Sequence, residues 1–254
     1  MKIRAIASNT FKEAIRDRIL YLLLFFAAVT IISSRILALL TVGDRVKIIK
    51  DVGLASLSLF GALMAIVMGT SLVHKEIDKK TIYTLLSKPI HRSQFILGKF
   101  FGLILTLFMM LLFMSLIFLA LVFSYTFTID WNLLLAIFLI FLELSLITSV
   151  AILFSCFSTP ILSSIFSLSF YLIGHLSWGL ETLIQKINPG PVKVLIQIIH
   201  LLLPDLENFN IKTEVVHNLP LPSHLFIFAP VYGFFFTLFC LTIASFIFRK
   251  RDFI

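Results

Sequence analysis

The sequence predicts an all-α integral membrane protein with six transmembrane helices. The chain has 254 residues, of which 59% are hydrophobic and only 13% are charged. Soluble domains average about 45–50% apolar and about 25% charged residues. The apolar residues, 28 phenylalanines among them, gather in six runs near or above the roughly 20 residues that a bilayer core requires. Residues 1–254 therefore form a single transmembrane domain that uses lipid as its solvent.

The six predicted spans follow one another with one long polar segment and one long mixed segment between them. We place the spans at residues 19–40, 53–73, 100–127, 131–154, 161–180 and 225–248. The third is long enough to tilt in the membrane or to project beyond it.

Residues 1–18 precede the first span and predict an amphipathic helix. Ile3, Ile6 and Phe11 fall on one side of a helical wheel, and Lys12 and Arg16 fall on the other. Such a helix suits the membrane interface, with its basic side toward anionic head groups. The alternative is a short helix that packs against the spans of the chain itself. The pattern does not separate the two.

The distribution of Lys and Arg predicts the orientation of the chain. Residues 1–18, 74–99, 155–160 and 249–254 lie on one side of the membrane and hold fourteen of these residues, against seven on the other side. Cytoplasmic segments carry the excess of Lys and Arg. Both termini and the 74–99 segment are therefore expected in the cytoplasm, as in a multi-pass protein of the bacterial inner membrane. The net charge of +8 is explained by this placement and implies no nucleic-acid partner.

The 74–99 segment is the longest polar stretch in the first half of the chain. Residues 77–86 predict a half-apolar helix, which Pro89 ends because the residue before a proline resists the α region. Ser93 is then expected to cap the third span. Held between two spans, this helix suits docking of a cytosolic partner. The alternative is a solvated loop whose apolar face rests on the bilayer.

The 181–224 segment is the large outer connection. A break at residues 188–191 precedes an apolar stretch at 192–203, in which Lys193, Gln197 and His200 form one polar stripe. Twelve residues cannot span a bilayer. We expect a short helix at the outer interface.

Glu143 is the only carboxylate deep in a predicted span. An ionisable residue there costs at least about 2.5 kcal/mol on insertion scales and is a functional hypothesis by default. It either lines a substrate path with Ser145 and Ser149, or is protonated and hydrogen-bonded to one of these serines or to another span. His175 is placed near the outer end of the fifth span, at the interface and at a different depth from Glu143.

Small residues at four-residue spacing predict close helix packing. They occur in the second span and at the start of the third, and we favour a seam within the monomer over a dimer seam. The residues are Gly61, Ala65, Gly69, Gly98 and Gly102.

Three stretches together resemble the permeases of ABC type-2 exporters. Residues 80–89, Lys-Thr-Ile-Tyr-Thr-Leu-Leu-Ser-Lys-Pro, follow Glu76 and precede Arg92, and this stretch is similar to the cytoplasmic coupling segment of that family. Residues 10–18 resemble its N-terminal helix. Residues 203–210, Leu-Pro-Asp-Leu-Glu-Asn-Phe-Asn, resemble the subgroup associated with maturation of a multicopper enzyme, nitrous oxide reductase. Many members have Gly where Lys80 stands.

The resemblance implies partners for this chain. Two permease copies, in a homodimer by preference, would pair with two copies of a separate ATPase that receives the coupling segment, and a periplasmic partner is a further possibility. The coupling residues would be Glu76, Lys80, Thr81, Leu85, Pro89 and Arg92. The sequence agrees in one respect, since it contains no Gly-x-x-x-x-Gly-Lys-Ser/Thr phosphate loop. ATP and Mg²⁺ are therefore expected on the partner, and no cofactor on this chain.

Two other functions are weighed against the exporter. A membrane-embedded enzyme needs a reactive constellation, and the sequence shows neither a His-Glu-x-x-His motif nor a pair of intramembrane aspartates. Cys156 and Cys240 lack ligand spacing, and the outer segment has no Cys/Met/His cluster for copper. We expect no catalytic residue and no metal site. A non-transporting membrane anchor or assembly factor stays open.

Overall fold

The fold is described from a computed structural model. It describes residues 2–40, 44–78, 92–128, 130–177, 190, 193, 204–221 and 225–250, without the side chains of residues 72–78, 225 and 250. Predictions that fall on other residues, including the outer helix expected at 192–203, lie outside this part of the chain.

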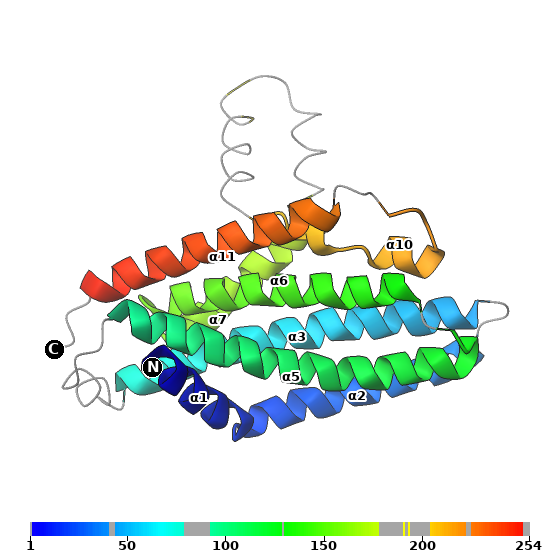
Figure 1. The fold of residues 1–254 in the computed structure, drawn as a ribbon, viewed down its shortest axis with the longest axis horizontal. Coiled ribbons are helices and arrows are strands. Elements are labelled where there is room, and N and C mark those ends of the chain that lie inside the picture. The colour runs from blue at the N-terminus through cyan, green and yellow to red at the C-terminus, as the bar shows by residue number, and fades with distance from the viewer. Residues whose placement is uncertain are drawn as a thin grey trace.

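The described residues form a bundle of helices (Figure 1). Both termini lie at one end of the bundle, here called the terminal end, and the opposite end is called the α10 end. The elements are α1 (Lys2–Ile15), α2 (Arg18–Leu39), α3 (Arg45–Asp78), α5 (Arg92–Thr126), α6 (Trp131–Ser155), α7 (Pro160–His175), the 3₁₀ turn η1 (Leu206–Phe209), α10 (Lys212–His217) and α11 (Leu225–Lys250).

Local sequence explains where several helices begin. Asp17 caps α2 by accepting a hydrogen bond from the Ile19 amide at 3.0 Å, and Asp130 caps α6 through the Asn132 amide at 3.1 Å. Both satisfy amides that have no partner within the helix. Pro160 opens α7, where a missing N–H costs nothing.

Five of the described helices are long and apolar enough to cross a membrane, namely α2, α3, α5, α6 and α11. These match five of the six predicted spans. The remaining span, predicted at 161–180, corresponds to α7, which has 16 residues and is about 24 Å long. A bilayer core is about 30 Å thick. Six spans therefore stay a prediction.

Helices α3 and α5 extend well beyond the spans predicted at 53–73 and 100–127. The α3 helix begins at Arg45, and α5 begins at Arg92. Hydropathy marks only the part of a helix that suits hydrocarbon, so it misses the turns outside it. Ser93 consequently lies inside α5, and its prediction as an N-cap is wrong.

The N-terminal helix α1 packs against α5, which is the second of the two arrangements considered for residues 1–18. Gly98 and Gly102 of α5 form the contact. A Cβ on Gly98 would lie 2.7 Å from the Ile6 side chain, and one on Gly102 would lie 2.6 Å from the Ala7 carbonyl oxygen. The absence of side chains at these two positions lets the helices approach.

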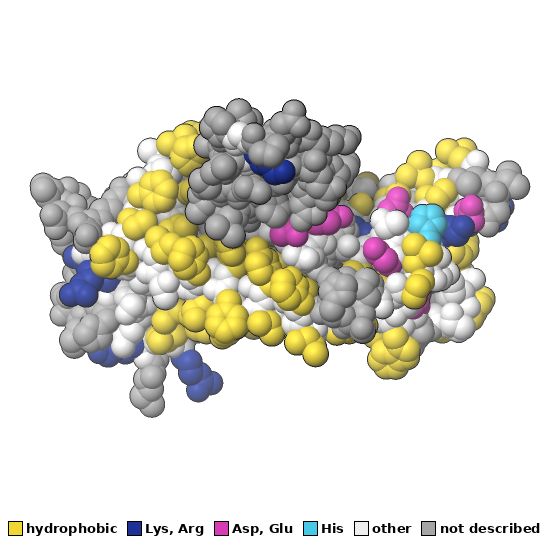
Figure 2. All heavy atoms as spheres, turned by 90° about the horizontal axis from the view of Figure 1, so that it is seen from above, with side chains coloured by type: hydrophobic (Ala, Val, Ile, Leu, Met, Phe, Trp, Pro, Cys, Tyr) yellow, Lys and Arg dark blue, Asp and Glu magenta, His cyan; other side chains and the backbone are white. Residues whose placement is uncertain are grey.

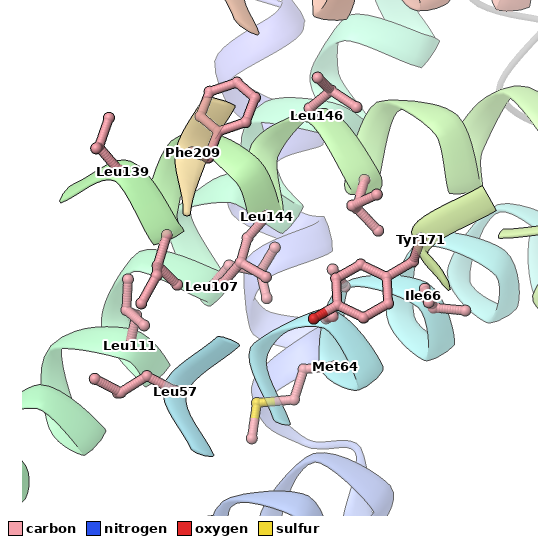
Figure 3. Packing of buried hydrophobic residues seen from close by; sticks show 14 of the residues in the cluster. Leu57, Met64, Ile66, Leu107, Leu111, Leu139, Leu144, Leu146, Tyr171 and Phe209 are labelled. Atoms are coloured by element: carbon pink, nitrogen blue, oxygen red, sulfur yellow. The ribbon is translucent and has the colours of Figure 1, made fainter. Parts of the chain in front are cut away.

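The second glycine pattern lies between α3 and α6. A Cβ on Gly61 would lie 2.6 Å from Leu144, and one on Gly69 would lie 2.7 Å from Ala151. Ala65, between them, is buried. The surrounding core is formed by apolar side chains of α3, α5, α6 and α7 (Figure 3).

The short helix α7 ends inside the bundle, and a later segment packs beside its end. Residues 204–217 contain η1, which contacts α6, α7 and α11, and α10, which contacts α3 and α6. Gly174 allows this approach, because a Cβ there would lie 2.7 Å from the Leu206 side chain. This segment brings its polar residues against α6 and α7.

Candidate functional site

The predicted coupling residues lie mostly outside the described part of the chain. Lys80, Thr81, Leu85 and Pro89 belong to residues 79–91, which are not described. Glu76 lies in the last turns of α3, and its side chain is outside the described part of the chain. Arg92 is the one member whose side chain the structure places.

Arg92 joins the first turn of α5 to the last turn of α11. Its Nη1 atom donates hydrogen bonds to the main-chain carbonyls of Phe248 at 3.0 Å and Arg249 at 2.9 Å. The last carbonyls of a helix accept no hydrogen bond from within the helix, and they carry partial negative charge. The rings of Phe95 and Phe248 stack beside this contact, with centroids 5.5 Å apart.

A buried lysine joins α1 to the same part of α5. The Lys99 side chain is 1% exposed, and its Nζ lies 3.7 Å from Oε2 of Glu13. Nζ also lies 5.8 Å from the centroid of the Phe95 ring. The start of α5, which follows residues 79–91 in the sequence, is thus attached to both α1 and α11.

A second group of polar residues surrounds Glu143 in the middle of α6. Oε1 of Glu143 lies 2.8 Å from Nε2 of His175, at the end of α7. The expectation that these residues lie at different depths is therefore wrong. Glu143 lies 12 residues before the end of α6 and His175 lies 15 residues after the start of α7. The last residue of α6 and the first residue of α7 lie at the same end of the bundle. Measured along the helices from that end, Glu143 is about 18 Å deep and His175 is about 22 Å deep.

Ser145 and Ser149, predicted to line one path with Glu143, do not lie with it. Ser145 lines a groove formed with α5 and α11, and its hydroxyl donates to the Phe141 carbonyl at 2.8 Å. Ser149 donates to the Leu146 carbonyl at 2.7 Å. Because successive helical residues are about 100° apart, the two serines share a face that Glu143 does not. The three residues do not form one surface, and neither serine is the hydrogen-bond partner of Glu143 that was considered.

Residues of the 204–217 segment complete the polar group around Glu143. Oε2 of Glu207 lies 3.8 Å from Nδ1 of His175, so that each ring nitrogen faces a carboxylate. The His175 side chain and the amide of Asn210 lower the pKa of Glu207, against the effect of burial. Burial lowers the pKa of Lys212, and the negative charges of Glu143 and Glu207 oppose this.

Further hydrogen bonds hold this segment in place. Asp205 accepts a hydrogen bond from the Ser177 hydroxyl, and its own amide donates to the Tyr232 hydroxyl on α11 at 3.0 Å. On the other side, the Tyr171 hydroxyl lies 3.1 Å from Oγ of Ser58 on α3. Tyr171 is drawn between α3 and α6 in Figure 3. The segment is thereby tied to Ser177, just after α7, and to α11, while Tyr171 ties α7 to α3.

Sequence reasoning missed Glu207 and Lys212 and assigned His175 to the interface. One signal could have found the Glu143–His175 pair, which is that both residues lie at similar counts from the short connection at 156–159. No comparable signal exists for Glu207, because the fold of the segment after α7 decides its position.

The described residues show one further feature of interest, an apolar groove between α5, α6 and α11. Its volume is about 280 Å³, and its lining includes Phe100, Leu142 and Leu238. Only Ser145 and Thr237 contribute polar side chains.

The surface carries charge unevenly along the bundle. Lys and Arg gather at the terminal end, while Asp and Glu gather toward the α10 end, and apolar side chains cover much of the length between them (Figure 2). Within the described residues, no group of three or more His, Cys, Asp or Glu is arranged to hold a metal ion.

Comparison with known proteins identifies a family that the sequence of the chain matches. The model of the family described as "ABC-2 family transporter protein" matches residues 4–251. No curated protein sequence matches the chain.

Proposed function

The chain belongs to the ABC-2 family of transporter proteins, and from this we propose that it is the membrane-spanning permease subunit of an ATP-driven exporter. A separate ATPase subunit would bind ATP and Mg²⁺ and drive the switch of the bundle between inward and outward states. The chain itself would carry no cofactor and no catalytic residue.

The observation that carries this proposal is a joint at the terminal end of the bundle, formed by the contacts of Arg92 with α11 and of Lys99 with α1. Residues 79–91 connect α3 to α5, and α5 is attached there to α11 by Arg92 and to α1 by Lys99. A partner that pushes on residues 79–91 would therefore move several helices together. Such a joint is what an ATPase-driven switch requires, because it spreads a local force across the bundle.

The assembly would contain two permease copies, as a homodimer, and two ATPase copies in the bacterial inner membrane. Both termini and residues 79–91 would face the cytoplasm, and the α10 end would face outward. In this arrangement α7 is a short fifth span, α1 packs against α5 on the inner side, and residues 192–203 lie at the outer interface.

The resemblance of residues 203–210 to the nitrous oxide reductase subgroup supports a role in export for enzyme maturation, with a periplasmic protein as a further partner. In the structure, residues 204–210 of this stretch pack against α6 and α7. Their fold against the bundle favours a role in shaping the outward-facing side of the permease.

Association with the ATPase tests the proposal. Thr81→Arg and Leu85→Arg place a charge on the face of the predicted coupling helix that would enter the ATPase. We expect each variant to purify as a folded protein that no longer brings the ATPase with it. Thr84→Arg, on the opposite face, is the matched control and should retain the ATPase.

Full association of the Thr81 and Leu85 variants with the ATPase would contradict the docking role. Transport is tested apart from docking, in vesicles that contain the permease and its ATPase. Vesicles that hydrolyse ATP without moving any offered substrate would support the non-transporting anchor instead.

A further inference from the structure

Three side chains form a series that runs from the surface to the middle of the bundle. The Glu207 side chain is 40% exposed, His175 is 19% exposed, and Glu143 is 1% exposed. His175 lies between the two carboxylates and presents one ring nitrogen to each. An imidazole placed in this way can take a proton on one nitrogen and release one from the other.

The buried end of the series is incompletely bonded. Oε1 of Glu143 contacts His175, whereas Oε2 is buried and has no hydrogen-bond partner among the described residues. A buried, ionised carboxylate oxygen without a hydrogen-bond partner is costly. A proton on this carboxyl group removes the charge and with it most of that cost.

We propose that Glu143 is a proton-binding site that exchanges protons with water through His175 and Glu207. A proton from water binds the Glu207 carboxylate and passes to Nδ1 of His175. The ring releases its Nε2 proton to Oε1 of Glu143. One proton moves from hydronium in the surrounding water to Glu143, and nothing is oxidised or reduced. His175 is left as the tautomer protonated on Nδ1, and it regains its Nε2 proton when Glu143 returns its proton along the same route.

The two distances define what the transfer needs. The 2.8 Å contact between His175 and Glu143 is a hydrogen bond. The 3.8 Å gap between His175 and Glu207 is too long for one, so a bridging water or a rotation of the half-exposed Glu207 side chain closes it.

The other charged groups near the series leave the whole group with a net negative charge, which favours the binding of a proton. On α10, Lys212 interacts with Glu143, with Glu207 and with Asp51 of α3. Three carboxylates thus face one lysine and one histidine, so the group still carries excess negative charge when His175 is protonated.

Among the titratable groups on the other helices, the tyrosine of α7 lies beside His175, and those named on α5 lie away from the series. Tyr171 of α7 has its ring centroid 4.7 Å from that of His175. Tyr232 of α11 bonds to the Asp205 amide. On α5, Lys99 lies by Glu13, and Tyr125 lies under Arg35.

Infrared spectroscopy of the isolated full-length chain in detergent tests the proposal without the ATPase. A buried protonated carboxyl group gives a carbonyl band that moves when its proton is exchanged for a deuteron. We expect a band that grows as the pH falls and that Glu143→Gln removes.

Two variants test the route. His175→Asn and Glu207→Gln should keep the band and slow its exchange with D₂O, the first by roughly a hundredfold, the low end for a positioned proton-transfer group. The matched control for the histidine variant is His217→Asn, which alters an exposed histidine of α10. Exchange in the His175 variant at the wild-type rate would overturn the route.

A measurement on the unmodified chain covers the case in which Glu143→Gln does not fold. Hydrophobic carbodiimides react with protonated carboxyl groups in apolar surroundings. Mass spectrometry should locate the modification at Glu143, with a yield that rises at acidic pH. Absence of modification at Glu143 over the whole pH range in which the chain stays folded would show that it takes no proton.

Discussion

At the scale of single residues, the contact between Lys99 and Glu13 shows how a charge is held inside this bundle. The Lys99 side chain is 1% exposed while Glu13 is 34% exposed, so the pair lies at the edge of the buried region. Removing a lysine from water costs several kcal/mol, which a nearby carboxylate repays only in part. The pair therefore fixes the position of α1 on α5 more than it raises overall stability.

A double-mutant cycle on Lys99→Met and Glu13→Gln tests this interpretation. Glu13→Gln alone leaves the lysine buried with less compensation, so we expect a clear loss of stability, and the double variant should recover part of it. The expected coupling is about 1 kcal/mol or more, within the range for contacting residues. The free energy of unfolding in detergent, measured for all four proteins, gives this value. Additive effects would show that Glu13 does not stabilise the buried charge.

Residue-scale contacts were predictable only where sequence alone fixes the geometry. The four-residue spacing of Gly61, Ala65 and Gly69 predicts a close helix contact, and in the structure Gly61 and Gly69 both face α6. The spacing of Glu143, Ser145 and Ser149 already excludes a shared face, a point that the path hypothesis overlooked. The partner of Glu143 was missed because His175 was counted from the outer end of an assumed full span.

At the scale of elements, the ends of α5 and α11 form a joint. Arg92 supplies the polar contact and Phe95 with Phe248 supplies the apolar one. Both lie next to residues 79–91, where α5 begins.

We expect Arg92→Ala to loosen this joint. A hydrogen bond that involves a charged group contributes about 1.5–3 kcal/mol. Spin labels at Ser93, in the first turn of α5, and at Thr242, about two turns before the end of α11, report the separation of the two helices. Both positions are exposed, and Cys156 and Cys240 are replaced first. The distance distribution should broaden in Arg92→Ala. Arg249→Ala is the control, because Arg249 contributes only its main-chain carbonyl, and its distribution should stay narrow. Equal distributions in both variants would mean that Arg92 does not hold the joint.

The sequence predicts that the long helices exist, but it does not predict where they begin and end. Each of the long helices contains an apolar run that hydropathy identifies, since lipid solvation demands it. Helix α7 is shorter than the predicted span, and η1 of a later segment, residues 204–217, contacts it. A contact between segments so far apart in the sequence leaves no local pattern.

At the scale of the whole molecule, charge separates along the bundle. Basic side chains gather at the end that holds both termini, and acidic ones gather toward the other (Figure 2). The same asymmetry appears in the sequence, with fourteen Lys and Arg assigned to one side and seven to the other. For a chain in the bacterial inner membrane, the excess of Lys and Arg on the cytoplasmic side predicts that the termini lie in the cytoplasm.

Labelling of single cysteines in intact cells tests this orientation. Asp44→Cys lies at the start of α3, toward the α10 end, and Lys12→Cys lies in α1, and both positions are exposed. Loss of the Asp44–Lys47 contact is harmless, because exposed ion pairs contribute about 0–1 kcal/mol. A membrane-impermeant maleimide should label Asp44→Cys in intact cells and Lys12→Cys only after permeabilisation. Background stays low because Cys156 and Cys240 are buried. Labelling of Lys12→Cys in intact cells would reverse the orientation, and residues 79–91 would then face away from any cytosolic ATPase.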